Sequence, residues 1–149
     1  MHDSDQNSFR AKQVAQLHTP AILRIEDNPV NELLVRQWFA QRRDLILLTA
    51  HDSYQGLKMV YVHKPAVILM EIDMPGLNGH AMLEILREKP ETEHIPVIAL
   101  SSNAYHPRQI NEVLAAGFFG YLTNPFVPDV FMDAVDAALH FSAAHRHAP

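Results

Sequence analysis

Cysteine is absent from this chain of 149 residues, which excludes a disulfide framework and thiolate chemistry and is compatible with a reducing cytoplasm. Long apolar runs are absent as well, since none approaches the roughly 20 residues that span a bilayer. The amino terminus, MHDSDQNSFRAK, is acidic and polar where a secretion signal would be basic and then apolar. We therefore expect a soluble, cytoplasmic protein that has no membrane partner.

Positive charge and glycine are both scarce. The 12 Lys and Arg residues against 17 Asp and Glu give a formal net charge of −5, so we expect no nucleic-acid partner. Only five glycines are present and none forms a GxGxxG run, which argues against a dinucleotide-binding domain.

The ten histidines are scattered, and only His145 and His147 lie close together near the end, which favours a solvated tail over a metal site.

Short apolar runs alternate with longer amphipathic segments from Ala21 onward. We predict strands at 21–25, 44–50, 66–71, 95–100 and 118–122, and helices at 29–42, 53–63, 79–88, 106–116 and 127–143. Five βα units in succession predict an α/β fold in which helices cover both faces of a parallel sheet. The length fits one domain, so we expect a polar N-terminal extension over 1–20, a domain over 21–142 and a flexible C-terminal tail over 143–149.

Two local signals predict where helices begin and end. Asn28 before Pro29 is typical of an N-cap followed by proline at the first helical position. Gly117 follows the periodic run of its helix, as a residue just past a helix C-terminus often does. These signals agree with the helices predicted at 29–42 and 106–116.

Four segments carry a family resemblance. They are RIEDNPVN (24–31), ILMEIDMPGLNG (68–79), IPVIALSS (95–102) and FGYLTNPF (119–126). In order and spacing the chain resembles the receiver domains of response regulators in two-component signalling. The resemblance implies a flavodoxin-like, doubly wound, five-stranded parallel sheet in the order 2-1-3-4-5, in a single domain.

The resemblance also implies a site at the carboxyl ends of the strands, where such sheets bind ligands. Receivers have an acidic pair, here Glu26 and Asp27, a hydroxyl, here Ser101, a phosphate-accepting aspartate and a lysine. The aspartate position holds Glu71 and the lysine position holds Asn124. Carboxylates gathered in this way could form an oxygen shell for Mg²⁺, with these ligands: Glu26, Asp27, Glu71 and Asp73, the last through its backbone carbonyl.

The two altered positions predict a degenerate site. Glutamate is one methylene longer than aspartate, and a misplacement of about 1 Å can slow an in-line attack about 100-fold. Asn124 offers a hydrogen bond where the family has a point charge. We therefore predict a stand-alone pseudo-receiver that is no enzyme, binds Mg²⁺ at most weakly and acts on other proteins without phosphorylation. The alternative is a working phospho-receiver that accepts a phosphoryl group from a histidine kinase on Glu71 or Asp73, with Mg²⁺.

Three further residues bear on this site. Arg24 interrupts an apolar strand two residues before Glu26, hence on the same strand face, and we hypothesise that it neutralises Glu26 or Glu71; alternatively it extends to solvent along an apolar surface. Ser101 and Tyr121 match the switch pair of the family, although Tyr121 could simply pack at the end of its strand. The resemblance also implies a cis peptide between Asn124 and Pro125.

The segment 127–143 is apolar around most of its circumference. Its polar residues form one narrow stripe, and the apolar arc spans about 220° at about 100° per residue, about twice what a surface helix needs. The stripe consists of Asp129, Asp133, Asp136 and His140. In receivers, the fourth helix, fifth strand and fifth helix form the usual contact face, so we predict a homodimer or a protein partner there, with Tyr121, Phe131 and Leu139 on that face. Alternatively, a terminal segment folds back over it.

Overall fold

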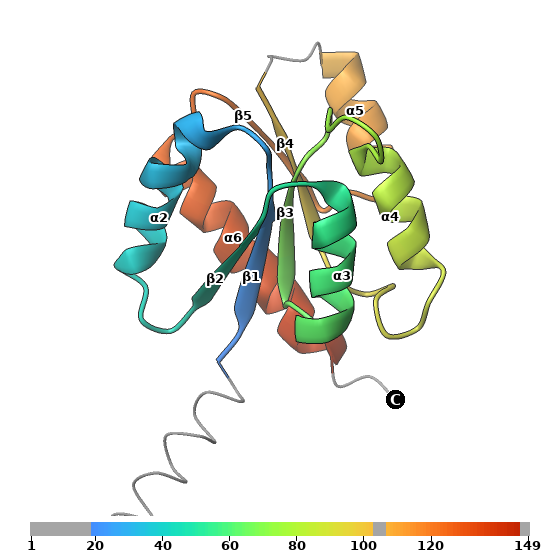
Figure 1. The fold of residues 1–149 in the computed structure, drawn as a ribbon, viewed down its shortest axis with the longest axis horizontal. Coiled ribbons are helices and arrows are strands. Elements are labelled where there is room, and N and C mark those ends of the chain that lie inside the picture. The colour runs from blue at the N-terminus through green and yellow to red at the C-terminus, as the bar shows by residue number, and fades with distance from the viewer. Residues whose placement is uncertain (1–18, 103–106, 147–149) are drawn as a thin grey trace, which may run out of the picture.

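A five-stranded parallel sheet forms the centre of the molecule in the computed structural model, which describes residues 19–102 and 107–146 (Figure 1). The strands run in the order β2-β1-β3-β4-β5, and each neighbouring pair is parallel. This confirms the predicted fold class and strand order. The strands are β1 (Ala21–Ile25), β2 (Ile46–Ala50), β3 (Val67–Glu71), β4 (Val97–Ser101) and β5 (Gly120–Thr123).

Helices cover both faces of the sheet (Figure 1). One face packs against α2 and α6 through a cluster that includes Phe39 and Phe131. The other face packs against α3, α4 and α5 through a cluster that includes Val60, Met82 and Val113. None of the helices in the described residues is long and apolar enough to cross a membrane. The helices are α2 (Glu32–Ala40), α3 (Ser53–His63), α4 (Gly79–Arg87), α5 (Pro107–Ala115) and α6 (Pro128–Arg146), with a short 3₁₀ helix η1 (Pro29–Asn31) before α2.

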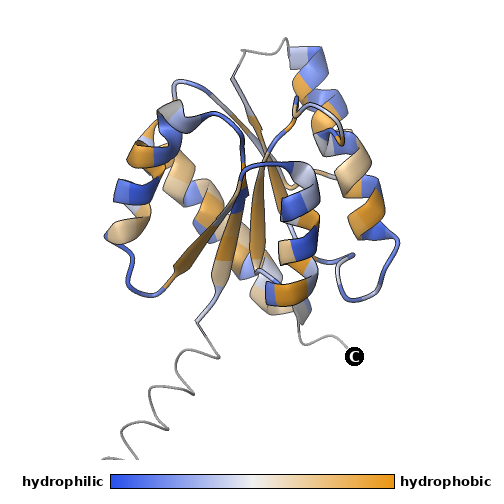
Figure 2. Ribbon diagram, in the orientation of Figure 1, coloured by the Kyte–Doolittle hydropathy of each residue, from blue (hydrophilic) through white to orange (hydrophobic). Residues whose placement is uncertain are grey.

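Two interior strands of the sheet, β3 and β4, are buried along their whole length. This burial is expected where helices lie on both sides of a parallel sheet and leave no face to water. Figure 2 shows the strands as the most continuously hydrophobic elements, with mixed colours on the helices. The edge strand β2 is half-buried for most of its length, and Ile46 is exposed.

Three details concern the predicted segment ends. Gly117 has φ +113°, which confirms its place after a helix. The prediction that Asn28 caps a helix is wrong, because the 3₁₀ turn Pro29–Asn31 comes first and α2 starts at Glu32. At the other end, α6 continues to Arg146, so the first part of the tail predicted at 143–149 is helical. Residues 1–18 of the predicted extension lie outside the described residues.

Candidate functional site

The carboxyl ends of four strands meet at one edge of the sheet. Glu26 directly follows β1, and its N–H donates to the carbonyl of Ala50 at 3.1 Å. Glu71 ends β3 beside Leu100 of β4. Asn124 directly follows β5, and its N–H donates to the carbonyl of Ser101 at 2.9 Å. The sheet therefore brings the predicted site positions on β1, β3, β4 and β5 to one end of the fold.

A buried ion pair lies at this edge. Arg24 is only 1% exposed and Glu26 only 4%; the Arg24 Nη2 atom lies 2.6 Å from Glu26 Oε2. Burial raises the pKa of Glu26, and the neighbouring Arg24 guanidinium opposes that rise. The hypothesis that Arg24 neutralises Glu26 is confirmed, and the alternative in which Arg24 extends to solvent is wrong.

Glu71 is also buried, with 8% of its surface exposed. Burial, followed by the negative charge of Glu26, raises the pKa of Glu71 from 4.5 to about 7; backbone hydrogen bonds at Asp73 and Ser102 act in the opposite direction. The Oε1 atom of Glu71 has no hydrogen-bond partner among the described residues. The carboxyl group thus titrates near neutral pH and keeps one oxygen unpaired.

The side chains of the predicted metal ligands do not form one cluster. Glu26 is turned to Arg24 and Asp27 is exposed, while Asp73 is expected to contribute only its backbone carbonyl. Within 19–102 and 107–146, no three His, Cys, Asp or Glu side chains lie close enough together to hold a metal ion. The family's metal therefore does not fit the side chains as they are arranged, because a guanidinium engages the first of the expected ligands. Weak Mg²⁺ binding stays a prediction.

The predicted switch residues differ in exposure. Ser101 is fully buried. Tyr121 is half-buried and packs against the core cluster on the side of α3, α4 and α5, which agrees with the plain packing role. The switch role of Ser101 and Tyr121, in which both side chains move together, stays a prediction. The peptide between Asn124 and Pro125 is cis, which confirms that expectation.

Phe131 does not lie on a partner face. It is 0% exposed, and its ring contacts Trp38 and Phe126 at centroid distances of 5.4 Å each and Phe39 at 6.5 Å. Leu139 is half-buried and packs against the same cluster. The prediction for Phe131 is wrong because α6 packs against both the sheet and α2, so a wider apolar arc is buried than the sheet alone would cover.

Other aromatic side chains are exposed near β5 and α6. Phe119 and Phe141 are each 36% exposed, and their ring centroids lie 5.3 Å apart. The His145 ring stacks on Phe141 at 3.9 Å. We call Phe119, Phe141 and His145 the aromatic patch; the sequence gives it no distinctive motif beyond the spacing of Phe141 and His145, one helical turn apart.

A long-range ion pair was not expected from the sequence. Arg42, just after α2, lies 2.9 Å from Asp136 of α6 and 3.0 Å from Asp44. Asp136 belongs to the polar stripe of α6, so this stripe faces α2 in part instead of only solvent. Since 94 positions separate Arg42 from Asp136, no local pattern predicts the contact.

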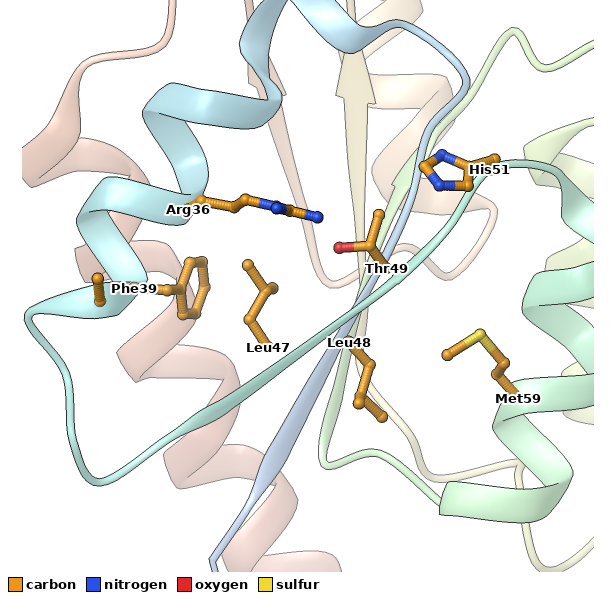
Figure 3. Close-up of a pocket in the computed structure, with 8 residues that line it drawn as sticks. Arg36, Phe39, Leu47, Leu48, Thr49, His51 and Met59 are labelled. Atoms are coloured by element: carbon orange, nitrogen blue, oxygen red, sulfur yellow. The ribbon is translucent and has the colours of Figure 1, made fainter.

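A cavity of about 580 Å³ lies along β2 between α2 and α3 (Figure 3). Phe39, Leu47 and Met59 form part of an apolar lining, and Arg36, Thr49 and His51 add polar groups. Figure 3 shows the Arg36 guanidinium directed toward Thr49. None of the predicted site residues lines this cavity, so it is separate from the acidic edge.

The fold and the acidic strand ends define the class of protein. The family model described as response regulator receiver domain matches residues 22–136, and the chain belongs to that family.

Individual relatives agree with this assignment. The nitrate/nitrite response regulator protein NarL of Escherichia coli (strain K12) is 30% identical over 118 residues, which are 78% of this chain and 53% of NarL. The chain thus spans about half the length of NarL. The polar-differentiation response regulator DivK of Brucella ovis is 25% identical over 121 residues, 81% of this chain and 97% of DivK. The receiver domain of Francisella response regulator 1452 superposes with a TM-score of 0.72 at 26% identity, covering 81% of this chain and 97% of that domain.

Proposed function

We propose that this receiver is a non-enzymatic signalling module that acts on a protein partner without phosphorylation of its own acidic site. The observation that carries the proposal is Glu71. A carboxylate acts as a nucleophile only when it is ionised and reachable. Glu71 is 8% exposed and has a pKa raised to about 7 by burial and by Glu26, so near neutral pH a large fraction of it is protonated.

The surroundings of Glu71 add a second argument. A phosphoryl group brings negative charge that must be neutralised in the transition state. The family resemblance puts a lysine at position 124, where this chain has Asn124. The nearby cation Arg24 is already bound to Glu26 at 2.6 Å. A phosphoryl group on Glu71 would therefore meet little free positive charge.

The aromatic patch is the proposed contact surface. Its members come from α6 and from the residue just before β5, and Phe119 and Phe141 retain exposed ring surface. Aromatic side chains are enriched at the centres of protein interfaces because they bury a large area at a small loss of conformational freedom. Receivers bind other proteins in signalling, and DivK, which this chain covers to 97%, is an example of a response regulator that is almost entirely a receiver. We propose a protein as the occupant, and a second copy of this chain is the first candidate to test.

Two experiments test the proposal. Incubation with a small-molecule phosphodonor and Mg²⁺, followed by intact-mass and peptide mass spectrometry, should leave the protein unmodified. A phosphate on Glu71 or on the exposed Asp73 would instead support the working phospho-receiver.

The contact surface is tested by light scattering of the wild type, Phe141→Ser and the control Tyr54→Ser. Tyr54 is 68% exposed on α3, away from the patch elements. A dimer that only Phe141→Ser dissociates identifies the patch as a homodimer interface. A monomer in every case excludes the second copy as occupant, and a dimer that Tyr54→Ser alone dissociates excludes the patch.

A further inference from the structure

Arg24 is a charged side chain in the middle of an apolar strand. Its register partners are Thr49 on β2 and Leu69 on β3, and it is 1% exposed. A buried guanidinium is strongly destabilising unless a counter-charge lies beside it. The counter-charge is Glu26, which contacts Arg24 at 2.6 Å, and both side chains are buried.

The same carboxylate is the first ligand that the family resemblance assigns to Mg²⁺. Its Oε2 atom accepts a hydrogen bond from the guanidinium at 2.6 Å, so a divalent cation would have to compete with Arg24 for that oxygen. A guanidinium at contact distance also repels any cation placed against Glu26. The other expected side-chain ligands do not compensate, since no three Asp, Glu, His or Cys side chains converge within the described residues.

We infer that Arg24 takes the place of the divalent cation at this acidic edge, as a positive charge built into β1. The guanidinium neutralises Glu26 and blocks it as a ligand. Glu71 still has an unpaired Oε1 atom that could bind a metal ion. The positive charge of Arg24 prevents a cation from binding there. The site is therefore charge-compensated without a metal, and removal of the guanidinium creates a metal site instead of destroying one.

This inference does not depend on the proposed function. The inference concerns which cation neutralises the acidic edge and is tested by metal binding. The proposed absence of phosphorylation is tested separately, by mass spectrometry. A wild-type protein that bound Mg²⁺ as tightly as Arg24→Leu but remained unphosphorylated would overturn the inference alone.

The test is a Mg²⁺ titration of the full chain, measured by calorimetry, for the wild type and three variants. Arg24→Leu removes the guanidinium and keeps an apolar stem, so Mg²⁺ affinity should rise about tenfold or more over wild type. Arg24→Lys keeps the positive charge and should bind no more tightly than wild type. Arg42→Leu is the matched control, because it removes a guanidinium that also binds carboxylates, those of Asp44 and Asp136, and it should leave Mg²⁺ affinity unchanged.

The inference is overturned if Arg24→Leu binds Mg²⁺ no more tightly than wild type, or if Arg24→Lys gains as much affinity as Arg24→Leu. A second measurement needs no variant, in case Arg24→Leu does not fold. Micromolar Mn²⁺ added to ¹⁵N-labelled wild type should cause no saturable broadening confined to the amides around Glu26 and Glu71. Saturable broadening there would show that the wild-type edge holds a divalent cation in spite of Arg24.

Discussion

Replacement of Glu71 by glutamine should stabilise the protein, and by an amount that depends on pH. Glutamine has nearly the same shape, still accepts hydrogen bonds and carries no charge. The pKa of Glu71 is about 7 in the folded protein because of burial and the charge of Glu26, against an ordinary value of 4.5. Between these pH values the folded protein holds a proton that the unfolded chain has released.

The sign and size follow from this difference. Since the folded state binds more protons, wild-type stability falls as pH rises from about 4.5 to about 7, and the loss is complete above that range. The difference between the folded and unfolded pKa values of Glu71 corresponds to a loss of at most about 3 kcal/mol in the free energy of unfolding at about pH 8. Glu71→Gln avoids the loss, so we expect a gain of about 1–3 kcal/mol at about pH 8 and close to none at about pH 4.

Urea unfolding followed by circular dichroism at both pH values measures these free energies. Glu91→Gln is the control, because Glu91 is exposed and the same chemical change there should give no pH-dependent gain. Equal effects of Glu71→Gln at the two pH values, or a loss of stability at about pH 8, would refute the reasoning that Glu71 is a destabilising buried acid.

Three other substitutions, the first with a matched control, test buried or conformationally restricted positions. Arg24→Met should lower the free energy of unfolding by about 3–5 kcal/mol because it leaves Glu26 buried without a counter-charge, whereas Arg42→Met, at a more exposed pair, should lose at most about 1 kcal/mol; equal losses in urea unfolding would argue against the buried pair. Phe131→Ala should lose about 3–5 kcal/mol by the same assay, since this fully buried ring leaves a cavity, and a loss below about 1 kcal/mol would place Phe131 at the surface after all. Gly117→Ala should lose about 1 kcal/mol or more, because φ is +113°; an unchanged or raised melting temperature would contradict this.

The fold was predictable because its signals are local and repeated. Apolar runs such as VILM and VIAL are typical of strands buried on both faces, and the observed β3 and β4 lie within about two residues of the predictions. The strand order required the family resemblance, since alternation of strands and helices does not specify which strands are neighbours. The start of α2 was misplaced because Asn28 and Pro29 also suit the 3₁₀ turn that precedes it.

The candidate site was predictable in part. The position of Arg24 two residues before Glu26 on one strand predicted their contact, because alternate residues share a strand face. The role of Phe131 could not be read from α6 alone, since its burial depends on Trp38 and Phe39 of α2. The number of free metal ligands was likewise unpredictable, because it depends on whether Arg24 turns toward Glu26 or toward solvent.

The central claim is that the two altered positions, Glu71 and Asn124, abolish phosphorylation. The most direct measurement compares the wild type with Glu71→Asp/Asn124→Lys, each with Arg24 retained and with Arg24→Leu, after incubation with a phosphodonor and Mg²⁺, by intact-mass spectrometry. The account predicts an unmodified wild type, the mass of one phosphate on Glu71→Asp/Asn124→Lys once Arg24→Leu has freed Glu26, and much smaller gains when either Glu71 or Asn124 is left unchanged, because the residues act in one constellation. A wild type that gains the same phosphate as that variant would contradict it.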